Sequence, residues 1–262
     1  MANAKPNRTP RLLTVVRARY VTPNMIRVTL AAPFVVGLPE GIEGAHCKLH
    51  LPERNESASA FELRLSAGPR AVVRTYTIRY IRPDTAEMDI DFVDHGDIGP
   101  ASAWARSAQP GDVCGFSGPG PIKLKDFYAD YYIVAADMSA LPVAAATLEA
   151  MPRDACGVAY FEVTSRDDIQ EINAPDGIEV HWLDHPEPHH ASAQLPEIIR
   201  DLPDFSGCVQ TCIAGESTAI QSLRAHLMNE RGLEKADAYI SGYWKIGLVE
   251  DEHQVFKRST AA

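Results

Sequence analysis

Two short stretches of this chain combine the residue types that hold a planar cofactor with a phosphate tail. In the first, Arg74-Thr75-Tyr76-Thr77, a guanidinium, an aromatic ring and two hydroxyls occur within one tetrapeptide. A guanidinium can grip a phosphate in bidentate fashion, and an aromatic face can stack on a flat ring. Alternation along a strand places Arg74 and Tyr76 on one face and Thr77 on the other, where Thr77 would hydrogen-bond a ring nitrogen. The alternative is a surface arginine beside a half-buried tyrosine, because such short patterns recur by chance.

The second stretch, residues 95–102, reads His-Gly-Asp-Ile-Gly-Pro-Ala-Ser. Pro100 fits the first turn of a helix, Gly99 allows close backbone approach, and Ser102 adds a hydroxyl near the free amides. A helix N-terminus with unpaired N–H groups is a ready pyrophosphate site. The alternative is an ordinary junction between strand, turn and helix. Because the two motifs lie roughly 20 residues apart in one small domain, together they favour a flavin dinucleotide site.

The elements that must position these motifs change character along the chain. Up to residue 120, about six strands separated by turns, with one short helix, favour a small antiparallel barrel. We expect the polar segment 53–69 to be a mobile loop. Beyond residue 121, an apolar run at 131–137 and further strands at 157–164, 178–183, 208–214 and 238–241 alternate with helices at 139–151, 192–201 and 217–231. This pattern predicts a parallel sheet with helices on both faces.

The second half offers its own candidate residues at strand ends. Gly215 and Glu216 follow an apolar strand, where an α/β domain places a nucleotide. No G-x-G-x-x-G motif is present, so a dinucleotide bound in the Rossmann manner is not predicted. Glu216 also fits a helix cap. Tyr243 and Trp244 are either core aromatics after the last strand or neighbours of a cofactor.

Composition narrows the class of protein. The net charge of −10 argues against nucleic acid as the main partner, and no apolar run is long enough for a membrane-spanning helix. Five cysteines without a C-x-x-C pair suit a reducing compartment and give no spacing for a metal site. We therefore expect a cytoplasmic protein with no metal, membrane or nucleic-acid partner.

The motifs, taken together and in order, resemble the siderophore-interacting proteins, which are FAD-containing reductases within the ferredoxin-reductase superfamily. The shared blocks are Arg74-Thr75-Tyr76-Thr77, residues 91–96 and 99–105, Ile213-Ala214-Gly215-Glu216, residues 239–245 and the tail at 250–253. The resemblance implies an FAD-binding Greek-key β-barrel domain at residues 1–125. It implies an α/β domain of the NAD(P)H-binding kind at residues 126–262.

The resemblance also assigns roles to individual residues. It implies that FAD is held by Arg74, Tyr76, Thr77, Asp91, Val93, His95, Gly99, Ala101 and Ser102, with Tyr243 and Trp244 beside the flavin. It implies a nicotinamide-nucleotide site at Asp137, Gly215 and Glu216, and contacts to the substrate from Lys48 and Lys245. Two departures affect these roles: Met138-Ser139 stands where the family often has Glu-Thr, and Lys245 replaces an arginine. Lysine keeps the charge but lacks the planar fork.

The function implied by the resemblance is reduction of the Fe³⁺ of a ferric siderophore to Fe²⁺, with electrons from NAD(P)H or reduced ferredoxin. No catalytic acid or base is expected, because the protein binds and tunes the cofactor. One alternative is a flavin oxidoreductase of the same superfamily with a different electron acceptor. Another is a siderophore-binding flavoprotein without catalysis. The particular siderophore, the choice of donor and the oligomeric state stay open.

Overall fold

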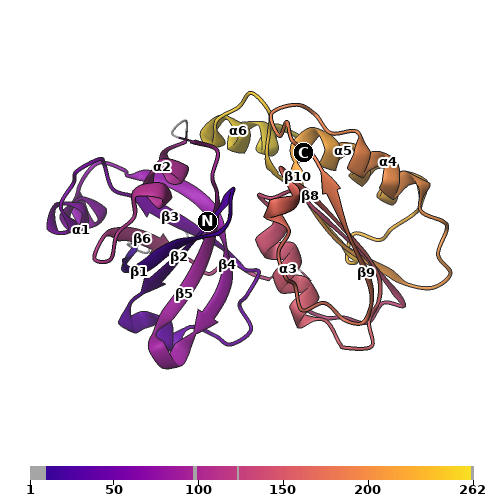
Figure 1. Ribbon diagram of the computed structural model, residues 1–262, viewed down its shortest axis with the longest axis horizontal. Coiled ribbons are helices and arrows are strands. Elements are labelled where there is room, and N and C mark those ends of the chain that lie inside the picture. The colour runs from indigo at the N-terminus through magenta and orange to yellow at the C-terminus, as the bar shows by residue number, and fades with distance from the viewer. Residues whose placement is uncertain (1–9, 97–98, 123, 261–262) are drawn as a thin grey trace, which may run out of the picture. The chain divides into compact units, whose positions relative to one another are not determined.

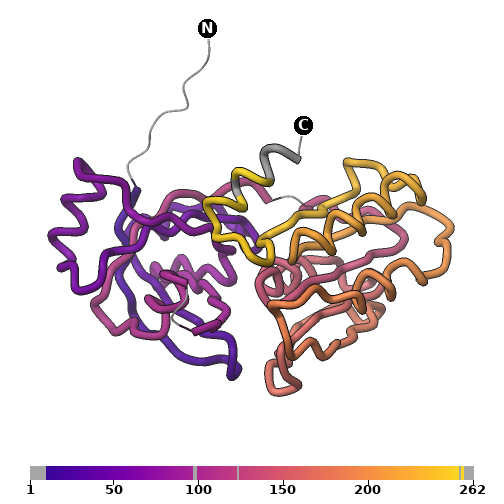
Figure 2. Tube along the Cα trace, turned by 90° about the horizontal axis from the view of Figure 1, so that it is seen from above, coloured from indigo at the N-terminus to yellow at the C-terminus, as the bar shows by residue number. Residues whose placement is uncertain are grey.

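The computed structural model describes residues 10–96, 99–122 and 124–260, in which the chain forms two compact units. The first unit, here the barrel, runs to Pro121 without residues 22–25, and the second, here the sheet unit, contains residues 22–25 and the chain from Ile122 onward. Figure 2 follows the trace through both units. No helix among the described residues is long and apolar enough to cross a membrane.

The barrel is closed and antiparallel, as predicted. Its strands follow the order β1-β2-β5-β4-β3-β6, and β1 closes on β6 with Arg11 opposite Phe116. The bounds are β1 Arg11–Thr22, β2 Met25–Ala31, β3 His46–Leu51, β4 Val72–Arg82, β5 Glu87–Val93 and β6 Val113–Ser117. Apolar side chains at alternate strand positions fill the interior, among them the fully buried Leu49, Ile78 and Phe92.

Short helices η1 (Pro33–Gly37), α1 (Ala58–Ala67), η2 (Pro83–Thr85) and α2 (Pro100–Ser107) connect these strands. The segment 53–69, expected from its polar composition to be mobile, contains the helix α1, which its sequence pattern did not predict. Ser57 caps α1 by accepting a hydrogen bond from the Ala60 amide at 3.3 Å. Arg64 pairs with Glu56 at 2.6 Å, and Phe61 is buried. One cap, one ion pair and one aromatic anchor thus order a helix whose composition is otherwise that of a loop.

The sheet unit has five parallel strands in the order β11-β10-β7-β8-β9. Its elements are β7 Tyr131–Ala136, α3 Leu141–Ala150, β8 Cys156–Val163, η4 Arg166–Asp168, β9 Gly177–Asp184, α4 Gln194–Asp201, β10 Val209–Glu216, α5 Ser217–Ala225, η5 His226–Glu230, β11 Ala238–Trp244 and α6 Glu250–Thr260. The chain moves outward from β7 to β8 and β9, then returns to the other side of β7. The switch point of the sheet therefore lies between β7 and β10.

Helices cover both faces of this sheet, with α3 on one face and α4 and α5 on the other (Figure 1). The core beneath α3 contains Leu148 and Phe161, and the core beneath α4 and α5 contains Ile199 and Leu223. The last strand, β11, extends to Trp244, beyond the predicted end at residue 241. Tyr243 and Trp244 thus belong to the sheet itself and do not follow it.

Candidate cofactor and nucleotide sites

The Arg74–Thr77 motif lies in β4, opposite β3. Cys47 faces Tyr76 and Leu49 faces Arg74, so Arg74 and Tyr76 share the face of the barrel wall that the buried Cys47 and Leu49 occupy. Tyr76 is half-buried. The chain thus presents a cation and an aromatic ring from one face of one strand.

Thr77 and Asp91 lie on the opposite face of the same wall. Ile78 pairs with Ile90 on the inner face, so alternation sends Thr77 and Asp91 outward. Immediately after the motif, a bulge between Ile78 and Tyr80 shifts the register of β4 against β5. Among the residues proposed for the cofactor, Arg74 and Tyr76 therefore lie on one face of the wall, and Thr77 and Asp91 lie on the other. The bulge changes which side chains of β4 beyond Ile78 lie on each face.

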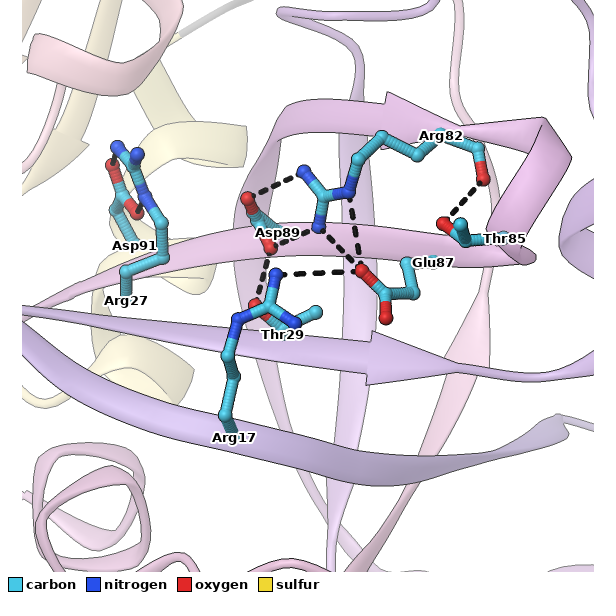
Figure 3. Close-up of polar contacts among 8 residues, drawn as sticks. All are labelled: Arg17, Arg27, Thr29, Arg82, Thr85, Glu87, Asp89 and Asp91. Carbon is cyan, nitrogen blue, oxygen red and sulfur yellow. Dashed lines mark hydrogen bonds and ion pairs between the residues drawn. The ribbon is translucent and has the colours of Figure 1, made fainter.

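Asp91 is already bound by a partner within the barrel. Arg27 on β2 donates from Nε and Nη2 to the two Asp91 oxygens at 2.7 and 2.8 Å (Figure 3). The Asp91 side chain is 2% exposed. Sequence reasoning did not find Arg27, whose partner lies 64 residues away. The geometry thus supports a role for Asp91 in holding Arg27, and direct contact between Asp91 and FAD stays a prediction.

A row of aromatic rings links the β4 motif to helix α2. The Tyr76 and Phe92 ring centroids lie 4.3 Å apart, and those of Phe92 and Trp104 lie 5.7 Å apart. Phe92 is fully buried, so Tyr76 on β4 and Trp104 on α2 pack against the same ring. The two motifs found in the sequence are therefore coupled through the core.

Asp94 organises the turn that leads into α2. Its carboxylate accepts hydrogen bonds from the Gly96 amide at 3.0 Å, the Ser102 hydroxyl at 3.3 Å and the Tyr20 hydroxyl at 2.7 Å. Burial favours the neutral acid, but these bonds and the nearby Arg106 outweigh it, so the pKa of Asp94 is lowered. Sequence reasoning did not single out Asp94, although an aspartate two residues before a glycine is a typical turn signal.

Ser102 lies in the first turn of α2, and its hydroxyl bonds within the chain. It is 1% exposed, and its hydroxyl bridges Asp94 and the amide of His95, the latter at 3.3 Å. The buried Ala101 and Ser102 form the first turn of α2, which begins at Pro100 as predicted. Residues 97 and 98 of the motif lie outside the described part of the chain. Val93, at the end of β5, is half-buried.

Gly99 stands at the N-cap of α2, against the ring of His95. A Cβ at position 99 would collide with the His95 imidazole, which is itself exposed. A larger residue at position 99 would therefore require the His95 ring or the backbone of the turn to shift. This tight turn leaves the first amides of an eight-residue helix at the end of the motif, the arrangement that accepts a pyrophosphate.

At the carboxyl edge of the sheet, Asp137 follows β7 directly. Its carboxylate accepts hydrogen bonds from the Ser139 amide at 2.9 Å and the Ala140 amide at 3.2 Å, at the start of α3. The Trp244 indole donates to the same carboxylate at 2.7 Å. Desolvation raises the pKa of Asp137, and the hydrogen bonds offset only part of this effect. Asp137 thus fills the helix terminus where a Rossmann fold would place pyrophosphate.

Gly215 and Glu216 end β10, next to Asp137. Gly215 has φ +152, and a Cβ there would lie 2.7 Å from an Asp137 oxygen, so only glycine fits. Glu216 caps α5 by accepting from the amides of Thr218 at 2.6 Å and Ala219 at 3.1 Å, which confirms the predicted cap. The three residues proposed for the nucleotide do gather at the switch point. Both neighbouring helix termini, however, are occupied by carboxylates of the chain itself.

The two lysines proposed for the substrate belong to different units. Lys48, half-buried on β3, donates to the Thr75 hydroxyl across the strand pair. Lys245 donates to the Thr218 hydroxyl at 3.0 Å, and its ammonium lies 4.6 Å from the centroid of the Phe256 ring. Tyr243 shares a hydrogen bond of 2.8 Å with Tyr239. Contact of Tyr243 and Trp244 with a flavin stays a prediction. Among the described residues, no group of three or more His, Cys, Asp or Glu side chains is arranged to hold a metal ion.

Comparison with known proteins places this chain in a family. The family model for the siderophore-interacting FAD-binding domain matches residues 14–122, and that for siderophore-interacting protein matches residues 129–247. Ferric vibriobactin reductase ViuB of Vibrio cholerae is 35% identical over 97% of this chain and 96% of its own. The chain belongs to the siderophore-interacting protein family.

Solved structures agree with this assignment. The siderophore-interacting protein SipS of Aeromonas hydrophila is 33% identical and superimposes with a TM-score of 0.81 over 97% of this chain and 98% of its own. A ferredoxin reductase in carbazole 1,9a-dioxygenase, 16% identical, gives a TM-score of 0.61 over 89% of this chain and 67% of its own. At that identity the likeness concerns the fold alone, which is of the ferredoxin-reductase kind.

Proposed function

We propose that this protein is an FAD-dependent reductase of ferric siderophores, acting in the cytoplasm with NAD(P)H or reduced ferredoxin as electron donor. The observation that carries the proposal is the barrel site: a cation and an aromatic ring on one face of β4, with the ring packed through Phe92 against Trp104 of α2. The near full-length similarity to a ferric vibriobactin reductase supports the choice of substrate. All five cysteines are free thiols, which suits a reducing compartment.

The residues present fit FAD. Arg74 supplies a guanidinium for a phosphate, the half-buried Tyr76 supplies an aromatic ring for stacking, and the α2 terminus behind Gly99 supplies backbone amides. When bound, FAD takes electrons from the donor and delivers them singly to chelated iron. Asp94 holds the turn before α2 through three hydrogen bonds, and Arg27 is held by Asp91, so the surroundings of the cofactor are fixed in advance.

A ferric siderophore must be attracted to the protein and must reach the flavin, but its reduction requires no catalytic acid or base. Fe²⁺ is held less firmly than Fe³⁺ by the hard oxygen ligands of a siderophore, so reduction alone releases the metal. Lys48 and Lys245 carry positive charges that attract an anionic chelate, and both are positioned by hydroxyls, of Thr75 and Thr218 respectively. Each ferric ion takes one electron, so one two-electron donor serves two chelates.

The test is anaerobic reduction of the purified flavoprotein by NADH, NADPH or reduced ferredoxin, followed by a panel of ferric siderophores. Flavin reoxidation with Fe²⁺ release, captured by a ferrous chelator, is the expected result. No bound flavin and no binding of added FAD would refute the proposal. Equal rates with simple acceptors would favour a general flavin oxidoreductase, and chelate binding without turnover would favour a binding protein.

A further inference from the structure

An exposed ion pair joins the carboxyl ends of β8 and β9. Arg166 Nε lies 2.9 Å from Asp184 Oδ2, and the two side chains are 65% and 47% exposed. Ser165 caps the turn that carries Arg166 by accepting the Asp167 amide at 3.1 Å. The backbone of Arg166 is therefore held in place, while its guanidinium faces solvent and Asp184.

The position of this pair matters because of the strand order. β7, α3 and β8 form the first βαβ unit beside the switch point. In dinucleotide-binding sheets of the Rossmann kind, residues after the second strand read the adenosine ribose. This chain lacks the glycine-rich phosphate loop of those sheets, so the comparison concerns only the place of the ribose at the end of the second strand. An acidic residue there accepts a bond from the free 2′-hydroxyl, whereas an arginine accommodates a 2′-phosphate. Arg166 stands at the place of such an arginine, but Asp184 offsets its charge.

The rest of this edge is electronegative as well. Asp137 and Glu216 occupy the termini of α3 and α5, and Asp167 follows Arg166 directly. Lys245 lies near the start of α5, where its ammonium bonds to Thr218. A 2′-phosphate adds up to two negative charges to the nucleotide. At this edge of the sheet it would meet acidic groups and an arginine, Arg166, that is already paired with Asp184.

We propose that the nucleotide donor is one with an unphosphorylated adenosine ribose, NADH in preference to NADPH, and that Asp184 determines this choice by pairing with Arg166. The inference rests on the proposed function, since it requires a nicotinamide nucleotide at the sheet edge. It adds a specificity-determining pair outside the residues already assigned to cofactor, nucleotide and substrate.

The chain supplies a matched control on the same two strands. Arg153 and Asp176 form a second exposed pair, 3.4 Å apart, with side chains 55% and 100% exposed. Arg153 precedes β8 and Asp176 precedes β9, so this pair lies at the amino edge of the sheet. Asp184→Asn and Asp176→Asn change the net charge equally, at opposite edges of the sheet. Arg153 keeps its hydrogen bonds to the carbonyls of Asn173 and Ala174 after the second change, so that variant controls for the loss of one surface charge.

The experiment measures binding of two probes without redox chemistry, ADP-ribose and 2′-phospho-ADP-ribose, to the FAD-loaded protein by calorimetry at low ionic strength. The native protein should bind ADP-ribose at least about tenfold more tightly. Asp184→Asn should reduce that preference about tenfold, and adding Arg166→Gln should restore it. Asp176→Asn should leave the ratio within about twofold. Salt should weaken the discrimination, because the pair is exposed.

Three results would overturn the inference: tighter binding of the phosphorylated probe to the native protein, an equal effect of the two aspartate variants, or no binding of either probe. Thermal unfolding checks that the variants are folded, and exposed pairs should move the midpoint by less than about 2 °C. Reduction of ferric siderophores by chemically or ferredoxin-reduced flavoprotein is measured separately. If it persists while neither probe binds, the inference fails and the proposed reductase function stands.

Discussion

Asp89 and Asp91 in the barrel pair with arginines from neighbouring strands, whereas Asp137 and Glu216 in the sheet unit lie at strand ends beside the starts of helices. On β5, Asp89 receives two bonds from Arg82 at 2.7 and 2.8 Å, and Asp91 is held by Arg27 (Figure 3). In the sheet unit, Asp137 holds the turn that leads into α3, and Glu216 caps α5. Residues 1–121 contain 14 basic and 12 acidic side chains, and residues 122–262 contain 11 and 23.

The difference shows in how each unit treats a buried carboxylate. Desolvation favours the neutral acid in Asp89, Asp137 and Glu162 alike. In Asp89 the hydrogen bonds from Arg82 and Thr29 outweigh desolvation, and the pKa is lowered. In Asp137 and Glu162 desolvation dominates and the pKa is raised. The barrel therefore stabilises its negative charges, while the sheet unit tolerates them at the edge where a nucleotide would bind.

The largest effect should come from breaking a pair in the barrel wall. Asp91→Ala leaves Arg27, whose side chain is 13% exposed, without its bidentate partner. We expect a loss of about 3 kcal/mol in the free energy of unfolding, measured by urea denaturation. The matched change in the sheet unit, Asp184→Ala, should cost less than about 1 kcal/mol because that pair is exposed. Equal costs would contradict the contrast between the two units.

The next effect concerns the cofactor. Gly99→Ala should weaken FAD binding by about tenfold, since the new methyl group collides with His95 and displaces the turn before α2. Fluorescence titration of the apoprotein with FAD measures this. Gly37→Ala is the control, because a Cβ there meets nothing within 4 Å. Because His95 is itself predicted to contact FAD, the steric cause is tested in a His95→Ala background, where adding Gly99→Ala should weaken FAD binding much less than it does in the native protein. An equal loss in both backgrounds would refute the steric cause.

A smaller expected effect is a difference between the two units in how stability depends on pH. Burial raises the pKa of Glu162, so its folded form binds a proton more tightly than the unfolded form. The stability that protonated Glu162 contributes is present below the pKa of Glu162 in the unfolded chain. It is lost as the pH rises through the higher pKa of Glu162 in the folded protein. Glu162→Gln removes this loss and should raise the melting midpoint by about 2 °C at pH 7.5, with little change at pH 4. Scanning calorimetry at both pH values checks it.

Asp94 in the barrel should show the opposite sign. Its pKa is lowered in the folded state, so its contribution is present above the unfolded pKa and is lost as pH falls through the folded pKa. Asp94→Asn should therefore lower the midpoint at pH 7.5, and the effect should shrink as the pH falls toward 3. The same direction of change in both variants would show that the two units do not differ as described.

The smallest effects are expected at the two substrate lysines. Lys48→Ala or Lys245→Ala removes one exposed or half-buried charge, and each should raise the KM for an anionic ferric siderophore about three- to fivefold. FAD affinity should not change. Lys235→Ala, which removes an exposed lysine before β11, is the control. An unchanged KM in both variants would remove these lysines from the site.

Much of this structure could be predicted from local features of the sequence. Alternation predicted that Arg74 and Tyr76 share a face, and Gly99-Pro100 predicted the start of α2, because both depend on neighbouring residues only. The order of strands and helices predicted the barrel and the parallel sheet. The α1 helix escaped detection because a single buried residue, Phe61, anchors it and gives no periodic apolar pattern.

What the sequence could not reveal were partners distant along the chain. Arg27 pairs with Asp91 across 64 residues, and Trp244 bonds to Asp137 across 107. Either acid, considered alone, fits a ligand contact as well as a structural one. The bulge at Ile78 and Tyr80 was equally hidden, since it is a property of the pairing between two strands and not of either strand alone.

The strand order of the sheet unit bears on how this protein is made. The central strand β7 ends at Ala136, but β10, its neighbour on one side, begins only at Val209. On the ribosome, β7 therefore waits about 4 to 15 seconds for that neighbour at ordinary rates of elongation. During this interval an apolar strand has one edge without a hydrogen-bonding partner, which is a template for pairing with other chains. Expression yield should therefore respond to chaperone supply and to translation speed across residues 137–208.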